Sequence, residues 1–318
     1  MPKTLKLIRG IHSLKRWQQA SVVTIGNFDG VHIGHQQMIT RLCEESQQRG
    51  LPSVLVTFEP LPHEFFAGDK APLRLMSLRD KLGYLAEHSD LDALLCLRFD
   101  KNFSQQTAEQ FVRRILVEGL DAKYVLLGDD FRFGYQRLGD FDLLKQEAEQ
   151  AGFDVEAMTS VCHRDVRVSS TLVRTTLAEG NLEQAAELLG RPYRLSGRVI
   201  KGDQLGRKLG YPTANIHLKR SNLALSGVFA VSVDTSIGVY HGMANIGWRP
   251  TVAGRELRFE VNIFDYSDDI YGQYLDVDFH AKLRDEQRFD SIDQLKTQLG
   301  LDEQAAREYF RAKDAVIA

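Results

Sequence analysis

The first half of the chain alternates short apolar runs with amphipathic stretches. Runs rich in Val, Leu and Ile predict buried strands at residues 21–25, 54–58, 93–99, 124–128 and 155–159. Apolar residues at helical spacing predict helices over 35–49, 79–87 and 140–151, and a further helix after a Thr107–Gln110 capping box. Strands that alternate with helices indicate a parallel sheet covered on both faces, which binds ligands at the carboxyl ends of its strands.

The pattern changes in the second half. Helices are predicted over 171–179 and 181–189, and β-rich runs follow at 193–200, 228–233, 257–264 and 274–279. Gly, Asn and Asp turns separate these runs, so they predict a compact antiparallel barrel or sandwich. Two terminal helices are expected over 291–299 and 302–312. We therefore expect an α/β domain over residues 1–186 and a β-barrel domain over 187–318.

Composition narrows the class of protein. The 318 residues are 43% hydrophobic and 26% charged, with a net charge of −3, which suits two globular domains and argues against a nucleic-acid partner. The 3 cysteines include no CxxC pair and predict reduced thiols of a cytoplasmic protein. No apolar run is long enough to span a membrane. Either a monomer or a transient oligomer is compatible with this composition.

The first candidate site is the segment GNFDGVHIGH at 26–35, which follows a strand and opens a helix. Gly30 and Gly34 let the backbone approach a phosphate at the positive end of the helix. His32 and His35 can face one point, where two imidazoles suit the charge that develops during nucleotidyl transfer. The plainer alternative is a Gly-rich turn with two incidental histidines.

Two later segments extend this site. GDDFRFG at 128–134 follows a predicted strand, and VSSTLVR at 168–174 places hydroxyls at a helix start with Arg174 one turn later. Beside a phosphate site, these hydroxyls and Arg174 would form charge-assisted hydrogen bonds. Alone, the first segment could be a charged loop with core aromatics, and the second an ordinary N-cap.

The second candidate site lies in the β-rich half. Glycines punctuate the segment that leads to PTAN at 212–215, and Thr213 and Asn215 share one face of an extended backbone, where their oxygens can ligate one Mg²⁺. The Walker A pattern is absent. Residues 245–251 are interpreted as a Gly/Pro turn with one cation. Glu260 could accept the proton of an attacking hydroxyl, or it could be a solvated strand residue.

The N-terminal motifs, with TFEPLPHEFF at 57–66, resemble the HxGH nucleotidyltransferases, and more narrowly the FMN adenylyltransferase module of bacterial bifunctional riboflavin kinase/FAD synthetases. The resemblance implies a Rossmann-like sheet in which His32 and His35 stabilise the transferring phosphate. The implied ATP-binding residues are Gly26, Phe28, Asp29, Gly34, Ser169, Ser170, Thr171 and Arg174. Asp129, Phe131 and Arg132 are implied to lie by the nucleotide or flavin phosphate. The family often carries His after F-x-P, but this chain has Leu61 there, so His63 is left out of the catalytic set.

The C-terminal motifs resemble the riboflavin kinase domain. They are GRVIKGDQLGRKLGYPTAN at 197–215, NIGWRPT at 245–251, the strand with Glu260, IYGQ at 270–273 and KLRDEQRF at 282–289. The resemblance implies an antiparallel barrel with Glu260 as general base and Thr213 and Asn215 on Mg-ATP. Gly202, Gly210 and Pro212 are implied to bind ATP phosphates, and Arg284 and Glu286 to lie near the flavin.

Together the two resemblances imply a bifunctional enzyme with ATP as co-substrate. The C-terminal domain would phosphorylate riboflavin to FMN, and the N-terminal domain would convert FMN and ATP to FAD and pyrophosphate. Three alternatives to this bifunctional enzyme remain open. One domain could be inactive, the N-terminal domain could use another phosphate acceptor, or the chain could bind FMN as a sensor without turnover.

Overall fold

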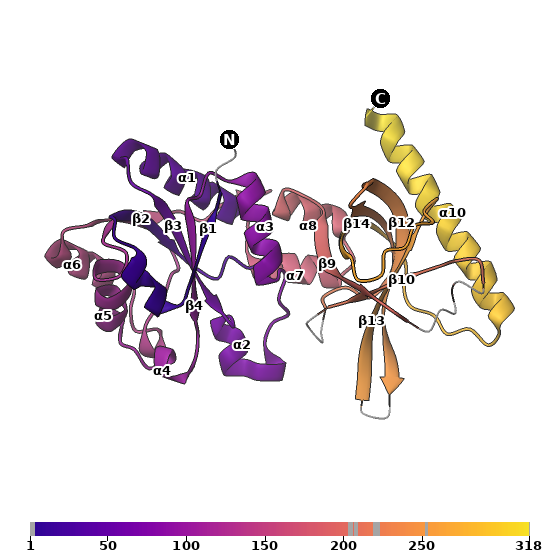
Figure 1. Cartoon of the computed structure of the whole chain (residues 1–318), viewed down its shortest axis with the longest axis horizontal. Helices are drawn as coiled ribbons and strands as arrows, with labels where there is room; N and C mark the ends of the chain where they lie inside the picture. The colour runs from indigo at the N-terminus through magenta and orange to yellow at the C-terminus, as the bar shows by residue number, and fades with distance from the viewer. Residues whose placement is uncertain (1–3, 203–205, 207–208, 219–222, 252–253, 318) are drawn as a thin grey trace. The chain divides into compact units, whose positions relative to one another are not determined.

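The chain divides into two compact units. The computed structural model describes residues 4–202, 206, 209–218, 223–251 and 254–317. Contacts between Cα atoms separate Met1–Ser170 from Thr171–Ala318, and Figure 1 shows the α/β unit and the β-barrel unit. The boundary proposed from the sequence, between residues 186 and 187, lies inside helix α8 (Leu182–Leu189).

The N-terminal unit is built on a six-stranded parallel sheet of order β1-β4-β3-β2-β5-β6. The strands are β1 (Lys6–Arg9), β2 (Ser21–Ile25), β3 (Ser53–Glu59), β4 (Ala93–Arg98), β5 (Ala122–Gly128) and β6 (Asp154–Met158). The predicted strands are confirmed. Sequence reasoning missed the short edge strand β1, whose pattern KLIR has charged ends and which pairs with β4.

Helices cover both faces of this sheet because successive strand residues alternate between them. Val22 packs with α1 (Ile33–Arg49) and α3 (Leu78–His88) on one face. Val23 belongs to the core on the other face. That core also includes residues of the 3-10 helix η1 (Ile11–Arg16), α5 (Ala108–Phe111), the π-helical turn η3 (Val112–Val117) and α6 (Phe141–Ala151).

The shorter elements of this unit connect its strands and helices. They are α2 (Pro62–Ala67), η2 (Gly68–Lys70), α4 (Lys101–Ser104), η4 (Tyr135–Arg137) and the hairpin of β7 (Cys162–His163) and β8 (Val166–Arg167). The capping box at Thr107 is present: its side chain accepts the Gln110 N–H, and the Gln110 side chain accepts the Thr107 N–H.

The C-terminal unit is a closed antiparallel barrel of order β10-β13-β12-β11-β14-β9. Its strands are β9 (Tyr193–Ile200), β10 (Ala214–His217), β11 (Gly227–Thr235), β12 (Gly238–Thr251), β13 (Gly254–Ile263) and β14 (Tyr274–Arg284). Helices α7 (Ser170–Ala178) and α8 precede the barrel, and α10 (Ile292–Ile317) ends the chain. Met243 and Phe264 of the barrel form a core with Ala306 and Phe310 of α10.

Two predictions for this unit are wrong. Residues 245–251 are not a turn but the second half of strand β12, which pairs with β13 through Thr251. The two expected terminal helices are one helix of 26 residues, α10. Gly300 does not interrupt it, and Asp302, expected to start a new helix, lies within it and binds Arg284 of β14.

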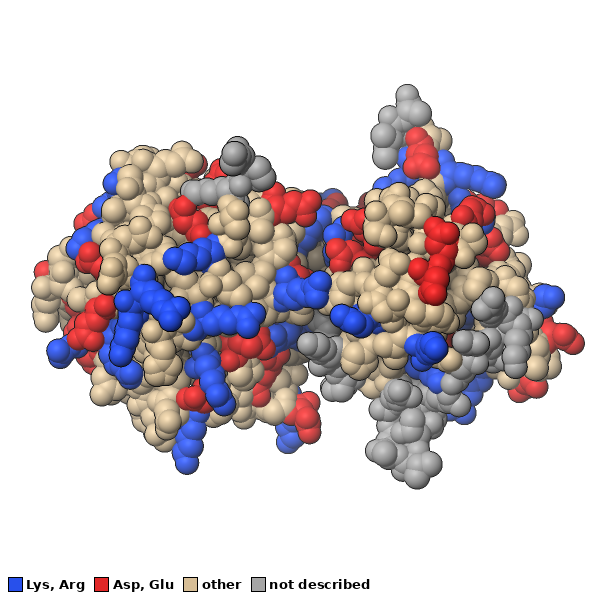
Figure 2. Space-filling model, in the orientation of Figure 1, with Lys and Arg blue, Asp and Glu red and all other residues tan. Residues whose placement is uncertain are grey.

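The surface carries mixed charge. On the face in Figure 2, Lys and Arg are interspersed with Asp and Glu over both units. Within the described parts of the chain, every helix is too short or too polar to cross a membrane.

Candidate active sites

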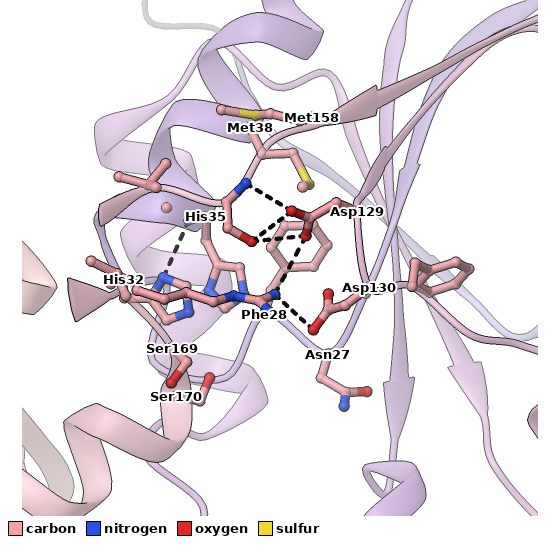
Figure 3. Close-up of a pocket in the computed structure, with 18 of the residues that line it drawn as sticks. Asn27, Phe28, His32, His35, Met38, Asp129, Asp130, Met158, Ser169 and Ser170 are labelled. Carbon is pink, nitrogen blue, oxygen red and sulfur yellow. Dashed lines mark hydrogen bonds and ion pairs between the residues drawn. The ribbon is translucent and has the colours of Figure 1, made fainter. Parts of the chain in front are cut away.

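A cavity of about 280 Å³ opens at the carboxyl ends of three neighbouring strands of the N-terminal sheet. Ile25 ends β2, Gly128 ends β5 and Met158 ends β6, and all three line the cavity. This is the edge of a parallel sheet at which ligands bind, as the strand–helix pattern predicted. Figure 3 shows the side chains that line it.

His32 and His35 meet in this cavity. His32 is the N-cap of α1, and its Nδ1 accepts the His35 backbone N–H at 3.3 Å. The two rings stack with centroids 3.6 Å apart (Figure 3). Burial, the neighbouring His32 and the charge of Lys81 hold the pKa of His35 well below its usual value. His35 is therefore uncharged at neutral pH and can serve as a hydrogen-bond donor to an anion.

Glycines in the loop before α1 make room for these rings. A Cβ on Gly34 would lie 3.3 Å from His32 Nδ1, and one on Gly26 would lie 3.0 Å from the Phe28 ring. Phe28 is buried and has a positive φ of 46°, which strains a bulky residue. Gly26 and Gly34 therefore leave space for the Phe28 and His32 side chains, in addition to any space that they leave for a phosphate.

Asp29 has a different place from the one expected. It does not line the cavity but is buried, and its carboxylate accepts the backbone N–H groups of Leu75 and Met76 at 3.0–3.1 Å. Ser170 donates its hydroxyl to the Asp29 carbonyl at 2.8 Å. Asp29 therefore anchors the loop of the two histidines, and its predicted role in ATP binding stays a prediction.

A second wall of the cavity is polar. Asp129 accepts the Ser160 hydroxyl at 2.8 Å and the Ser160 backbone N–H at 3.1 Å. Figure 3 marks the bonds of the Asp129 carboxylate with dashed lines. The Ser160 hydroxyl, with a weaker contribution from Arg167, lowers the pKa of Asp129. Arg167 also pairs with Asp130 at 2.7 Å. This wall therefore presents the Arg167 guanidinium to the cavity. A phosphate could take the place of its carboxylate partners, Asp129 and Asp130.

The remaining residues of the first predicted site fall into three groups. Phe131, Ser169 and Ser170 line the cavity, and their binding roles stay predictions. Arg132 lies outside the lining and pairs with Asp140 at 2.8 Å. Thr171 and Arg174 lie in α7, within the C-terminal unit, so their roles stay predictions.

Sequence reasoning missed several lining residues. They are Met38, Met158, Ser160 and Arg167. Arg167 directly precedes the segment 168–174, so a cation beside a predicted phosphate site was a usable signal. The methionines and Ser160 carried no such signal.

The second cavity, also about 280 Å³, lies against the barrel wall in the C-terminal unit. Strand pairing sets side chains from five neighbouring strands in one row, because directly paired residues point to the same face. The pairs are Asn215 with Glu260, Glu260 with Asn245, Asn245 with Val228, and Val228 with Arg284. All five line the cavity. Asn245 belongs to the segment mistaken for a turn.

Thr213 and Glu286 also line this cavity. Gly247 makes room for Glu286, because a Cβ there would lie 1.7 Å from Glu286 Oε1. Arg284 forms a bidentate ion pair with Asp302 of α10, both bonds measuring 2.7 Å, and Asp302 is only 3% exposed. Arg284 is thus held at the cavity edge by the terminal helix.

Gly202, Gly210 and Pro212 lie outside the cavity lining. Gly202 packs directly against the Asn215 side chain, because a Cβ there would lie 2.3–2.5 Å from its amide group. Gly210 has a φ of 89°, and the Pro212 carbonyl accepts the Asn262 amide at 2.7 Å. Of the three, Gly202 directly contacts a residue of the cavity, and the predicted ATP-binding roles of all three stay predictions.

Comparison with known proteins assigns each half of the chain to a family. The family model described as FAD synthetase matches residues 14–172, and the model described as riboflavin kinase matches residues 189–310. The bifunctional riboflavin kinase/FMN adenylyltransferase of Escherichia coli K12 is 49% identical over 96% of this chain and 98% of its own length. The protein of that name from Haemophilus influenzae is 44% identical over 97% of this chain and 100% of its own length.

The fold has a solved counterpart. A crystal structure of a macrolide-efflux protein from Streptococcus pneumoniae matches with a TM-score of 0.83 and 32% identity, covering 95% of this chain and 99% of that chain. The two family models, in this order along one chain, and the relatives that match over nearly their full length lead to one assignment. The chain belongs to the family of bifunctional riboflavin kinase/FMN adenylyltransferases.

Proposed function

We propose that this chain carries out both activities of its family, each in its own cavity. Riboflavin is phosphorylated to FMN in the C-terminal unit, and FMN and ATP become FAD and pyrophosphate in the N-terminal unit. The observation that carries the proposal is the polar row across the barrel: Asn215, Glu260 and Asn245 stand side by side on paired strands. A protein that only binds flavin has no need of a carboxylate set between two amides.

In the N-terminal cavity, the stacked pair of His32 and His35 would donate hydrogen bonds to the phosphate as its charge develops. The uncharged state of His35 suits it to donate without adding a buried charge. The N-terminus of α1 would add its partial positive charge. Ser169 and Ser170 at the cavity wall would bind further phosphate oxygens.

In the C-terminal cavity, Glu260 would take the proton from the ribityl 5′-hydroxyl as that hydroxyl attacks the γ-phosphate. Arg258 Nη1 lies 3.4 Å from Glu260 Oε1 and would help to orient the carboxylate toward the hydroxyl. Glu286 and Arg284 at the cavity wall would contact the flavin.

Mg²⁺ fits the donors that this cavity offers. Thr213 and Asn215 supply neutral oxygens, the hard donors that Mg²⁺ prefers, and it commonly completes its shell with water and substrate phosphates. Within the described residues, no cluster of three or more His, Cys, Asp or Glu is arranged to hold a metal ion. When bound, Mg²⁺ would neutralise phosphate charge during phosphoryl transfer.

We also propose a cytoplasmic enzyme that acts on small molecules, without a nucleic-acid partner. Cys43, Cys96 and Cys162 form no disulfide bond, as is usual in a reducing compartment. The interspersed charge in Figure 2 differs from the basic face typical of nucleic-acid binders.

The test is a time course with riboflavin, ATP and Mg²⁺, in which the flavins are separated by chromatography. FMN should appear first and FAD should follow. FMN alone would leave the kinase assignment standing and require another acceptor for the N-terminal cavity. Flavin binding without any turnover would favour the sensor alternative.

Variants assign each activity to its cavity. His32→Ala should abolish FAD formation and leave FMN formation unchanged, because His32 lies only in the first cavity. Glu260→Gln should slow FMN formation by on the order of 100-fold or more, as loss of a general base does. It should still convert supplied FMN to FAD. Equal loss of both activities in either variant would contradict two separate sites.

A further inference from the structure

Lys81 is a buried lysine with no part in the adenylyl transfer proposed for His32 and His35. It lies in the first turn of α3, its side chain is 3% exposed, and it is absent from the lining of the N-terminal cavity. A buried ammonium is costly unless its hydrogen bonds are satisfied. A lysine buried in this core therefore needs partners that satisfy its ammonium group.

The ammonium binds the loop that carries the two histidines. Lys81 Nζ donates a hydrogen bond to the Asn27 carbonyl at 2.6 Å. The hydroxyl of Thr57 on β3 donates to the same carbonyl at 3.2 Å. Two donors, one from α3 and one from the sheet, thus hold one peptide group of the loop.

This anchor sets the direction of the next peptide group. In a trans peptide the C=O and the following N–H point in opposite directions. Because the Asn27 carbonyl points to Lys81, the Phe28 N–H points away from it. Phe28 itself has a positive φ and packs 4.9 Å from the His35 ring. Such a strained position persists only where its surroundings fix it.

Charge links Lys81 to His35 as well. Burial lowers the pKa of Lys81 to about 8, with Arg74 acting in the same direction, while Asp29, Glu59 and Cys96 act in the opposite one. The ammonium is therefore largely protonated at neutral pH. Its charge and the neighbouring His32 both disfavour a proton on His35. His35 Nδ1 is buried without a hydrogen-bond partner among the described residues, so the neutral ring is expected to carry its proton on Nε2.

We propose that Lys81 is a positioning residue for adenylyl transfer: by anchoring the Asn27 carbonyl, it fixes the loop that places Phe28 and the two histidines around the reacting phosphate. The proposal rests on the FMN adenylyltransferase activity proposed above. Lys81 acts through the loop and touches neither nucleotide nor flavin.

The test uses the full-length chain with Lys81→Met, the conservative variant Lys81→Arg, and the control Lys70→Met, which removes an exposed lysine. FAD formation from FMN and FMN formation from riboflavin are measured separately for each. In Lys81→Met, kcat for FAD formation should fall by on the order of 10- to 100-fold, with a smaller change in KM, because loop misplacement affects alignment. FMN formation should be unchanged, and Lys81→Arg should recover part of the rate. Lys70→Met should match the unmodified chain.

A titration of His35 by NMR gives a second readout. In Lys81→Met the pKa of His35 should rise, because a positive charge that disfavours its proton has been removed. Wild-type FAD formation in Lys81→Met, or a parallel loss of both activities, would overturn the positioning role. If the unmodified chain made no FAD, the proposed function would fail instead, and the His35 titration would still decide whether Lys81 acts on this loop.

Discussion

At the scale of single residues, several glycines cannot carry a larger side chain because a residue of a candidate site packs against them. Gly34 lies against His32, Gly202 against Asn215 and Gly247 against Glu286. The sequence pattern suggested that such glycines admit phosphate. The structure shows that they leave space for side chains of the site. For Gly202 and Gly247 no local pattern could reveal this, because their partners Asn215 and Glu286 are distant in sequence.

Gly202→Ala tests this role. The added methyl group would overlap the Asn215 amide, so that amide must move away from its row beside Glu260. We expect kcat for FMN formation to fall on the order of tenfold, as small misplacements of catalytic groups do. FAD formation from supplied FMN should be unchanged and serves as the control. An unaltered kinase rate would show that Gly202 has no such role.

Lys81 should also give the folded chain a characteristic pH dependence. Its pKa is lowered from 10.5 to about 8 by burial, so between these values the unfolded chain binds more protons than the folded one. The free energy of unfolding should therefore rise with pH across this window, by up to about 3 kcal/mol. Urea denaturation at pH 7.5 and pH 10 measures the rise. Lys81→Met should lack it, and an equal rise in that variant would exclude Lys81 as the source.

At the scale of elements, the long apolar or periodic segments were predictable and the irregular ones were not. The strands of the parallel sheet are buried on both faces and carry a strong local signal, as at Val22 and Val23. Strand β12 contains Gly247 and Pro250, residue types that usually mark turns, yet pairing with β13 overrides that preference. Gly300 suggested a break between two helices, but α10 is continuous through it. Asp302, in the same helix, forms an ion pair with Arg284 of β14, a contact that the local sequence does not indicate.

The same helix gives a prediction for stability. Gly300 lies inside α10, where an added Cβ would come only as close as 3.4 Å to the Tyr211 hydroxyl. Gly300→Ala should therefore raise the free energy of unfolding by about 0.5–1 kcal/mol, because alanine loses less backbone entropy in a helix. The matched control is Gly210→Ala, which should destabilise the chain because φ there is 89°. Chemical denaturation compares the two, and a loss of stability in Gly300→Ala would contradict this packing.

At the scale of the whole molecule, two units with separate cores carry two chemistries. Leu126 belongs to a core of the α/β unit and Val231 is fully buried in the barrel. The pattern of hydrophobic residues predicted these two architectures. It could not predict which side chains face a cavity, since Asp29 and Arg132 turn out to bind other protein groups.

Separate cores predict separable unfolding transitions. Leu126→Ala and Val231→Ala each leave a void in one core, at a cost of about 2–5 kcal/mol for the leucine and less for the valine. In calorimetry, each variant should lower the melting temperature of one transition and leave the other in place. A single transition moved by both variants would show that the units unfold together.

The row formed by Asn215, Glu260 and Asn245 across the barrel limits the insertions and deletions that are compatible with kinase activity. Side chains alternate between the two faces of a strand, so inserting one residue within β10, β12 or β13 would turn its member of the row to the opposite face. In a closed barrel every strand is paired on both sides, so no strand can shift its register to restore the row. Insertions and deletions compatible with kinase activity should therefore be confined to the loops, while the strands accept only substitutions.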